Sequence, residues 1–229
     1  MKKLGHRLCP TTVKNILKKN GIPPMPFRKG MSWKNFIQPH LEVLWAADFF
    51  TEEVWTIKGL VTYYVLFLIH LGSRRVLVAG CTPNPSSVWT SQQARNFSMV
   101  LDEIPQRCRF IIHDRDSSFL PFDFVLKSEG IRIVKTPPQV PMCNCFAERF
   151  VREARETLRN IIPLGENHFQ HVLKCIETHH NKERPHQGID NLIPLGFDYP
   201  KKPAMSEEAC RTSSLGGLLN HYYIEKEAA

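Results

Sequence analysis

The stretch "RFIIHDRDSSF" at residues 109–119 places two aspartates directly after a short hydrophobic run. The run "RFIIH" at 109–113 reads as a buried strand, and a helix near 119–129, closed by Gly130, follows it. The next run, "IRIVK" at 131–135, reads as a second strand. A strand, a helix and a strand in this order normally form a parallel pair with a right-handed crossover.

Three further strands precede this unit. They are predicted from "LEVLWAADFF" at 41–50, "LVTYYVLFLIHL" at 60–71 and "RRVLVAGCT" at 74–82, and the last two are joined by a tight "GSRR" turn. Successive strands with short connections indicate an antiparallel meander. With a helix at 86–103, the pattern predicts an α/β fold: a mixed five-stranded sheet flanked by helices.

The rest of the chain divides around this sheet. A proline-broken loop, "TPPQVPMCN" at 136–144, leads to helices at about 145–162 and 166–180. At the other end, "CPTTVKNILKKNGIPP" predicts a short amphipathic helix with Lys14 and Lys18 facing outward. We therefore expect three parts: a helical remnant and linker at 1–38, a core at 39–195, and a tail at 196–229 whose structure is harder to place.

Charge and composition restrict the class of protein. The 30 Lys and Arg residues against 22 Asp and Glu give a net charge of +8, which favours a polyanionic partner such as nucleic acid. The longest apolar run, "LVTYYVLFLI" at 60–69, is too short to cross a bilayer. Seven scattered cysteines fit reduced thiols in a cytosol. Cys143 and Cys145 with His179 and His180 match a zinc site poorly.

Three acidic residues sit where a ligand could meet them. Asp48 interrupts a hydrophobic strand, where an ionised carboxylate is costly without a partner. Asp114 lies at the carboxyl end of a strand, the usual ligand-binding edge of an α/β sheet. Glu148 lies in the first turn of the helix at 145–162. The structural alternatives are a solvent-facing or backbone-bonded Asp48, a helix-capping Asp114 and a solvated Glu148; we expect Asp116 or Ser117 to be the cap.

The helix at 145–162 has two distinct faces. Ala147, Val151, Ala154, Leu158 and Ile161 form the expected buried stripe, with spacings of four and three residues. One position further on, Glu148 heads a row of three arginines, Arg152, Arg155 and Arg159, which are candidate DNA contacts. Arg149, Glu153 and Glu156 fit an ordinary solvated face with ion pairs along the helix.

Acids from three separate elements could converge on a pair of Mg²⁺ ions. Hard divalent cations take oxygen ligands, and a two-metal site activates an attacking oxygen and stabilises a leaving one in phosphoryl transfer. Such a site would explain acids within a basic protein, because the acids hold metal while the surrounding cations hold the phosphate backbone.

The triplet Asp48, Asp114 and Glu148, with 33 residues between the last two, resembles the DDE catalytic core of retroviral integrases and bacterial insertion-sequence transposases. The resemblance covers about 40 to 195, through "AADFFT", "RFIIHDRDSSF", "NCFAERFVREARETL" and "HHNKERPHQGI". Asn144, four residues before Glu148, and the "N-x-x-RPH" segment at 181–186 are its most specific features. Asp116 is the alternative to Asp114 as second acid.

The resemblance implies a ribonuclease-H-like fold, two Mg²⁺ or Mn²⁺ ions held by the three acids, and cutting and joining of DNA at the ends of a mobile element. It also implies a homo-oligomer in a bacterial-type cytoplasm, associated with the nucleoid. The amino-terminal helix would be the remnant of a helix-turn-helix domain, and the chain looks truncated beside such transposases.

Two other functions stay open at this point. A hydrolytic nuclease of the same fold would stop after cleavage. A non-catalytic DNA-binding protein, derived from a truncated transposase, would occupy element ends without cutting them. The histidines at 179, 180 and 186 could assist phosphate binding or serve the structure alone.

Overall fold

The computed structural model describes residues 9–21, 33–136, 145–196 and 209–224. The chain forms two compact units, Met1–Pro39 and His40–Ala229. The first contains α1 (Pro10–Lys19), whose first-turn proline needs no backbone donor, and most of α2 (Trp33–His40). Helix α1 buries none of its residues, so its apolar stripe has no core of its own to cover.

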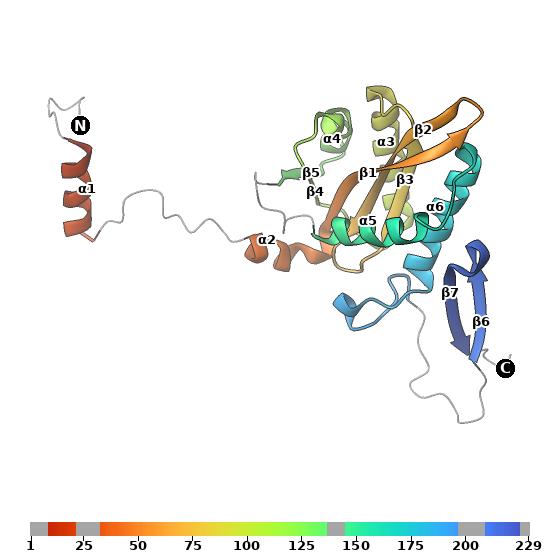
Figure 1. Cartoon of the computed structure of the whole chain (residues 1–229). Coiled ribbons are helices and arrows are strands. Elements are labelled where there is room, and N and C mark those ends of the chain that lie inside the picture. The colour runs from red at the N-terminus through yellow and green to blue at the C-terminus, as the bar shows by residue number, and fades with distance from the viewer. Residues whose placement is uncertain (1–8, 22–32, 137–144, 197–208, 225–229) are drawn as a thin grey trace. The chain divides into compact units, whose positions relative to one another are not determined.

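The second unit is built on a five-stranded sheet in the order β3-β2-β1-β4-β5 (Figure 1). Its strands are β1 (Leu44–Thr56), β2 (Gly59–His70), β3 (Val76–Thr82), β4 (Phe110–His113) and β5 (Arg132–Lys135). Strands β1 to β3 pair antiparallel, while β4 is parallel to both β1 and β5. The predicted mixed five-stranded sheet is confirmed.

The parallel pairing of β1 with β4 has a defined register. Leu44 lies opposite Phe110, and the ladder ends where Ala46 lies opposite Ile112. Asp48 and Asp114 each come two residues after that last pair. Since neighbouring strands are about 4.8 Å apart and side chains alternate with a period of two, the two aspartates leave the sheet at the same level and on the same side.

Helices cover both faces of this sheet (Figure 1). Helices α3 (Ser87–Glu103) and α4 (Leu120–Ser128) enclose a core with Trp45 and Ala47 of β1. Helices α5 (Cys145–Leu158) and α6 (Gly165–Lys182) cover the other face, where Phe150 packs against Phe67 with ring centroids 4.8 Å apart. Asp48 has the strand parity of Ala46 and Phe50, and so belongs to the α5 face.

Local signals in the sequence set several element ends. The Ser86 side chain accepts a hydrogen bond from the Trp89 amide at the start of α3. Asp116, the expected cap, accepts from the Ser118 amide at 2.8 Å at the start of the 3₁₀ turn Ser117–Phe119. Gly130 has a φ of +77° just after α4, as a left-handed helix end requires.

The outer edge of β3 is held by side chains of α6. The buried Asn181 amide donates to the Val76 carbonyl at 2.7 Å, and its carbonyl oxygen accepts from the Val76 amide at 2.8 Å. The Glu177 carboxylate accepts from the Val78 amide at 3.4 Å. Two side chains of a helix thereby occupy edge positions that a further strand would otherwise take.

Two predicted boundaries need correction, and one hairpin was not predicted. Strand β1 runs to Thr56, past the charged pair Glu52 and Glu53, because the hairpin with β2 continues to the Thr56–Gly59 turn. Helix α5 ends at Leu158 and not at 162, since Pro163 disfavours helix in the residue before it. In the tail, β6 (Ala209–Ser214) and β7 (Leu219–Ile224) form a hairpin that their mixed polar sequence did not indicate.

Short 3₁₀ turns complete the described structure, at Leu41–Val43, Gln187–Ile189 and Leu215–Gly217. None of the helices within the described residues is long and apolar enough to span a membrane.

The Asn181 bridge gives a test of this fold. Replacing Asn181 with Ala leaves a buried amide and a buried carbonyl of Val76 without their partners, so we expect the free energy of unfolding to fall by about 2–3 kcal/mol. Urea unfolding followed by circular dichroism measures it. Asn96→Ala, on the exposed side of α3, is the control and should change the value by less than about 0.5 kcal/mol. Equal effects of the two variants would contradict the assigned role.

Candidate active site

Asp48 lies in the sheet with its carboxylate partly buried. One carboxylate oxygen accepts a hydrogen bond from the Phe49 amide at 2.8 Å. Burial, together with the negative charges of Asp114 and Glu148, raises the pKa of Asp48 to about 6, against the lowering effects of the Phe49 amide and His113. The two predicted partners are therefore close enough for their charges to act on Asp48.

Asp114 is exposed at the end of β4. Its side chain accepts a hydrogen bond from the Asp116 amide at 3.0 Å, which orders the turn. Asp116 caps the following turn, and Asp114 is the first residue after strand β4. The choice of Asp114 over Asp116 as the second acid stays a prediction.

A buried histidine and aspartate hold the strand end that carries Asp114. His113 Nε2 lies 2.7 Å from Asp123 Oδ1 of α4, and His113 Nδ1 lies 2.6 Å from the Asp114 carbonyl. The His113 ring stacks on Phe119 at 4.2 Å between centroids, and Lys135 Nζ lies 3.6 Å from Asp123 Oδ2. Sequence reasoning missed this pair. Its one signal is an aspartate within the apolar segment "LPFDFVL" of α4.

Glu148 and Asp48 line one hollow, here called the carboxylate groove, of about 560 Å³, which runs between β1 and the length of α5. Arg152, Arg155 and Arg159 line the same groove. The helical phase inferred from the sequence thus places the arginine row beside two of the three acids. Asp114 does not line this groove; it follows the neighbouring strand β4, and its charge acts on Asp48.

The donor set suits a hard divalent cation. Carboxylate oxygens are the ligands that Mg²⁺ and Mn²⁺ prefer. A cation beside Asp48 would oppose the burial and the negative charges that raise its pKa. Among the described residues, however, these acids do not form a chelating cluster. Within the described ranges, no group of three or more His, Cys, Asp or Glu residues could hold a metal ion as they stand.

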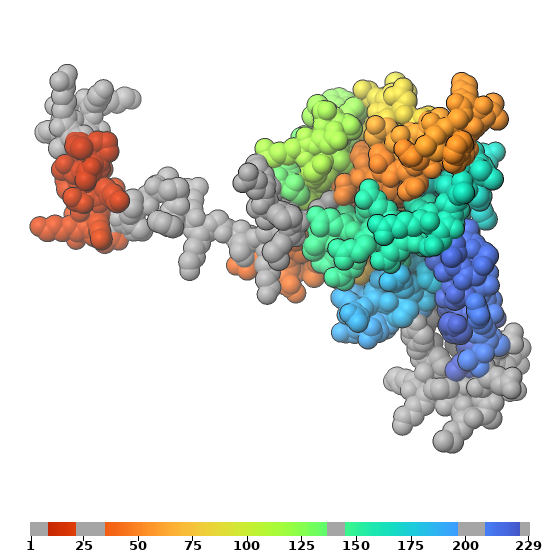
Figure 2. Space-filling view, in the orientation of Figure 1, coloured from red at the N-terminus to blue at the C-terminus, as the bar shows by residue number. Residues whose placement is uncertain are grey.

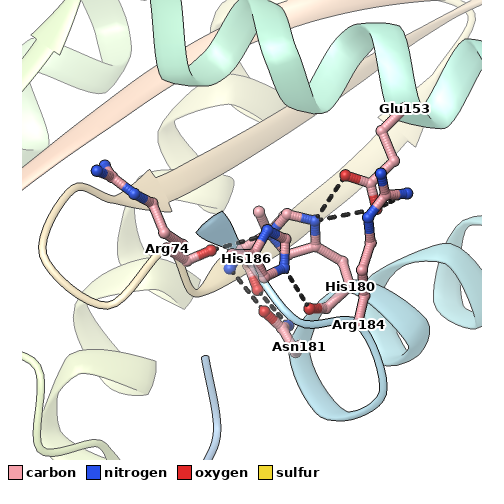
Figure 3. A network of polar contacts seen from close by, with 7 residues as sticks. Arg74, Glu153, His180, Asn181, Arg184 and His186 are labelled. Carbon is pink, nitrogen blue, oxygen red and sulfur yellow. Dashed lines mark hydrogen bonds and ion pairs between the residues drawn. The ribbon is translucent and has the colours of Figure 1, made fainter. Parts of the chain in front are cut away.

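A second polar network fixes α5 itself (Figure 3). His180 Nδ1 of α6 lies 3.1 Å from Glu153 Oε2, and His180 Nε2 lies 2.9 Å from the Arg74 carbonyl. Arg184 Nη1 lies 3.4 Å from Glu153 Oε1, and His186 Nε2 lies 3.0 Å from the His180 carbonyl. This cluster joins α5, α6 and the turn between β2 and β3.

The network corrects the prediction for Glu153, which is not part of a solvated face. Burial alone would raise the pKa of Glu153, but the hydrogen bond from His180 and the charges of His180, Arg184 and His186 outweigh it and keep the pKa below its ordinary value. His180 is buried, and its ring contacts Glu153, the Arg74 carbonyl and the rings of Phe150 and His186. Periodicity missed Glu153 because the partner lies on another helix.

The remaining predicted residues lie elsewhere. Lys14 and Lys18 are exposed on α1, in the unit Met1–Pro39. Asn144 lies outside the described residues. Of the predicted zinc alternative, Cys143 also lies outside them.

Comparison with known proteins gives one family match. Residues 129–194 match the family model described as the integrase core domain, a stretch that includes Glu148 and Glu153 but neither Asp48 nor Asp114. No curated protein matches the chain.

Solved structures of integrases are similar at low identity. The HTLV-2 integrase catalytic core domain in complex with magnesium, in its trimeric form, is 13% identical with a TM-score of 0.48, over 67% of this chain and 94% of that one. The catalytic core domain of BIV integrase is 16% identical with a TM-score of 0.47, over 67% and 91%.

The Asp48 environment predicts an unusual dependence of stability on pH. Because its folded pKa of about 6 exceeds the ordinary 3.8, the unfolded chain ionises first as pH rises, and stability falls across that window. We expect Asp48→Asn to raise the free energy of unfolding of the metal-free protein by on the order of 1–2 kcal/mol above pH 6 and to have little effect below pH 4. Calorimetry between about pH 4 and 8 measures this, with exposed Asp102→Asn as control; a pH-independent difference would contradict it.

The Glu153 network predicts the opposite dependence. Its lowered pKa means that the stabilisation is present above the ordinary pKa of 4.5 and is lost as pH falls through the folded value. Glu153→Gln should lower the free energy of unfolding at pH 7 by about 2–4 kcal/mol, because the buried His180 loses its carboxylate. Denaturant unfolding at pH 7 and pH 4 tests this, with the exposed Glu156→Gln on the same helix as matched control. A loss that persists unchanged at low pH would argue for a packing effect.

Proposed function

We propose that this chain is a DNA transposase or integrase core, a polynucleotidyl transferase that cuts and joins strands at the ends of a mobile element. The observation that carries the proposal is the meeting of Asp48 and Glu148 in one groove beside three arginines, with Asp114 directly after the neighbouring strand β4 and close enough for its charge to act on Asp48. The integrase core domain match over 129–194 supports it.

Each residue has a distinct part in this proposal. Asp48, Asp114 and Glu148 would hold two Mg²⁺ or Mn²⁺ ions, which when bound supply Lewis-acid activation of the attacking oxygen and stabilisation of the leaving one. Arg152, Arg155 and Arg159 would hold phosphates of the DNA backbone. Lys14 and Lys18 would add backbone contacts from a remnant of a helix-turn-helix domain, and Asn144 would support the site.

The reaction proceeds in two displacements at phosphorus. A water oxygen attacks a phosphodiester, and the bond to the 3′ oxygen breaks, which leaves a 3′-hydroxyl and a 5′-phosphate. In the second step the 3′-hydroxyl loses its proton and attacks a phosphate of target DNA, which joins the strands and releases another 3′-hydroxyl. Neither step needs a covalent protein intermediate, so acids and cations suffice. Paired element ends must be cut together, which favours a homo-oligomer.

A second candidate is a non-catalytic DNA-binding protein. It is favoured by the lack, within the described residues, of a closed group of three metal ligands. Such a protein would bind DNA with the same arginines and show no metal-dependent cleavage. A hydrolytic nuclease would cleave but not join.

Nicking of supercoiled plasmid DNA with Mg²⁺ or Mn²⁺ tests the proposal. We expect Glu148→Gln and Asp48→Asn each to lower the nicking rate at least about 100-fold, since each loses a charged ligand, while DNA binding measured by fluorescence anisotropy stays or strengthens. Glu129→Gln, exposed after α4, is the control and should keep full activity.

Joining of a pre-cut oligonucleotide to the plasmid then separates a transferase from a nuclease. Wild-type protein that binds DNA but does not nick it with either metal would favour the non-catalytic candidate.

A further inference from the structure

A second hollow lies on the other flank of α5, lined in part by Arg74, Arg149, Arg152 and Arg184. We call it the arginine pocket; its volume is about 360 Å³. Its residues come from α5, the turn between β2 and β3, and the segment 184–188 that follows α6. Nothing in the carboxylate site requires this concentration of cations.

Arg74 occupies a seat built from three separate segments. Its guanidinium carbon lies 3.8 Å from the centre of the Phe146 ring, and its Nη1 donates to the Leu71 carbonyl at 2.6 Å. On the other side, a Cβ added at Gly188 would lie 3.3 Å from Arg74 Nε and Nη2, so the glycine leaves room for the guanidinium. Arg74 also has a φ of 63°, a strained value for a residue that is not glycine.

Cations outnumber carboxylates in the arginine pocket, where four arginines stand beside Glu153 and Glu156. Burial lowers the pKa of Arg74; Cys145 opposes this by raising it, and the nearby charge of Arg149 adds a smaller lowering effect. Among the four arginines, only Arg184 forms an ion pair within the described part of the chain, and its partner Glu153 is already held by His180. A guanidinium that is held rigidly beside other positive charges can bind an oxyanion, whose negative charge offsets them.

The arginine pocket and the carboxylate groove lie on either side of α5 and share lining residues. Arg152 and Glu156 line both hollows. Figure 2 shows α5 (green to teal) across the visible face, with β1 and β2 (orange) on one side. From Arg149 to Arg155 the helix rises about 9 Å, the axial length of two or three phosphates along one DNA strand. A path of this length favours a polyanionic strand over a single small anion.

We propose that the arginine pocket is a second phosphate-binding site, which holds the backbone of a DNA strand that crosses α5 from the carboxylate groove. The site deepens the proposed function and rests on it for the identity of the strand. Arg74 and Arg149 would bind one phosphate, Arg74 as the fixed member and Arg149 as the exposed one. Arg152 would connect this phosphate to those in the groove.

The test measures binding of a fluorescent duplex by anisotropy, as a function of salt between about 50 and 200 mM. Arg149→Gln should weaken binding severalfold at low salt and reduce the slope of log K against log salt by about 0.9, the loss of one phosphate contact. Gly188→Val should also weaken binding, because it crowds the Arg74 seat without changing the net charge. Arg95→Gln, exposed on α3, is the matched charge control and should leave the slope nearly unchanged.

The outcomes separate this inference from the proposed function. If Arg149→Gln and Gly188→Val bind like the wild type, or if Arg95→Gln has the same effect, the inference is wrong even where the protein nicks DNA. If the slopes change as expected but the wild type does not nick, the second site stands and the catalytic proposal fails. Saturable micromolar binding of inorganic phosphate alone, measured by calorimetry, would overturn the argument for a continuous strand.

Discussion

The register of the parallel pair β1–β4 is the constraint on which the candidate site depends. The ladder ends with Ala46 opposite Ile112, and the next residues of the same parity are Asp48 and Asp114. A slip of one residue in either strand would turn one aspartate to the opposite face of the sheet. The hydrophobic neighbours prevent that slip, because Trp45 and Ile111 must face α3 and α4 while Ala46 and Ile112 face away. The apolar core therefore sets where the carboxylates emerge.

Two pairs of a histidine and a carboxylate, one on each face of the sheet, fix the positions of the elements that bear the acids. His113 and Asp123 hold the end of β4 just before Asp114, and His180 and Glu153 hold α5 little more than one turn after Glu148. In both pairs the carboxylate is largely buried and comes from a helix. Such polar contacts are directional, so they fix the rotation of a helix or strand end more narrowly than apolar packing does.

Much of this architecture follows from local pattern in the sequence. The buried run before Asp114, the cap at Asp116 and the left-handed end at Gly130 depend on near neighbours, and the structure bears them out. The predicted stripe of α5 is borne out only in part: Ala147, Ala154 and Leu158 are buried, whereas Val151 and Ile161 are half-buried and the unpredicted Phe150 and Thr157 are buried. Features set by distant partners could not be predicted in this way. By its position in the helix alone Glu153 would face solvent, but His180 of α6 lies against it. Strand β1 continues through its charged residues because β2 pairs with them. How closely the three acids meet depends on strand register and on α5 together, which periodicity does not specify.

The side chains that α6 lays along β3 also bear on how this chain behaves at high concentration. An uncovered sheet edge offers a template on which a second chain can add a strand, the first step toward aggregation. Asn181 and Glu177 take up backbone groups of Val76 and Val78 at that edge, while the opposite edge strand, β5, has only four residues and begins and ends with a basic side chain. Both borders of the five-stranded sheet are thus poor templates for the addition of a strand from another chain.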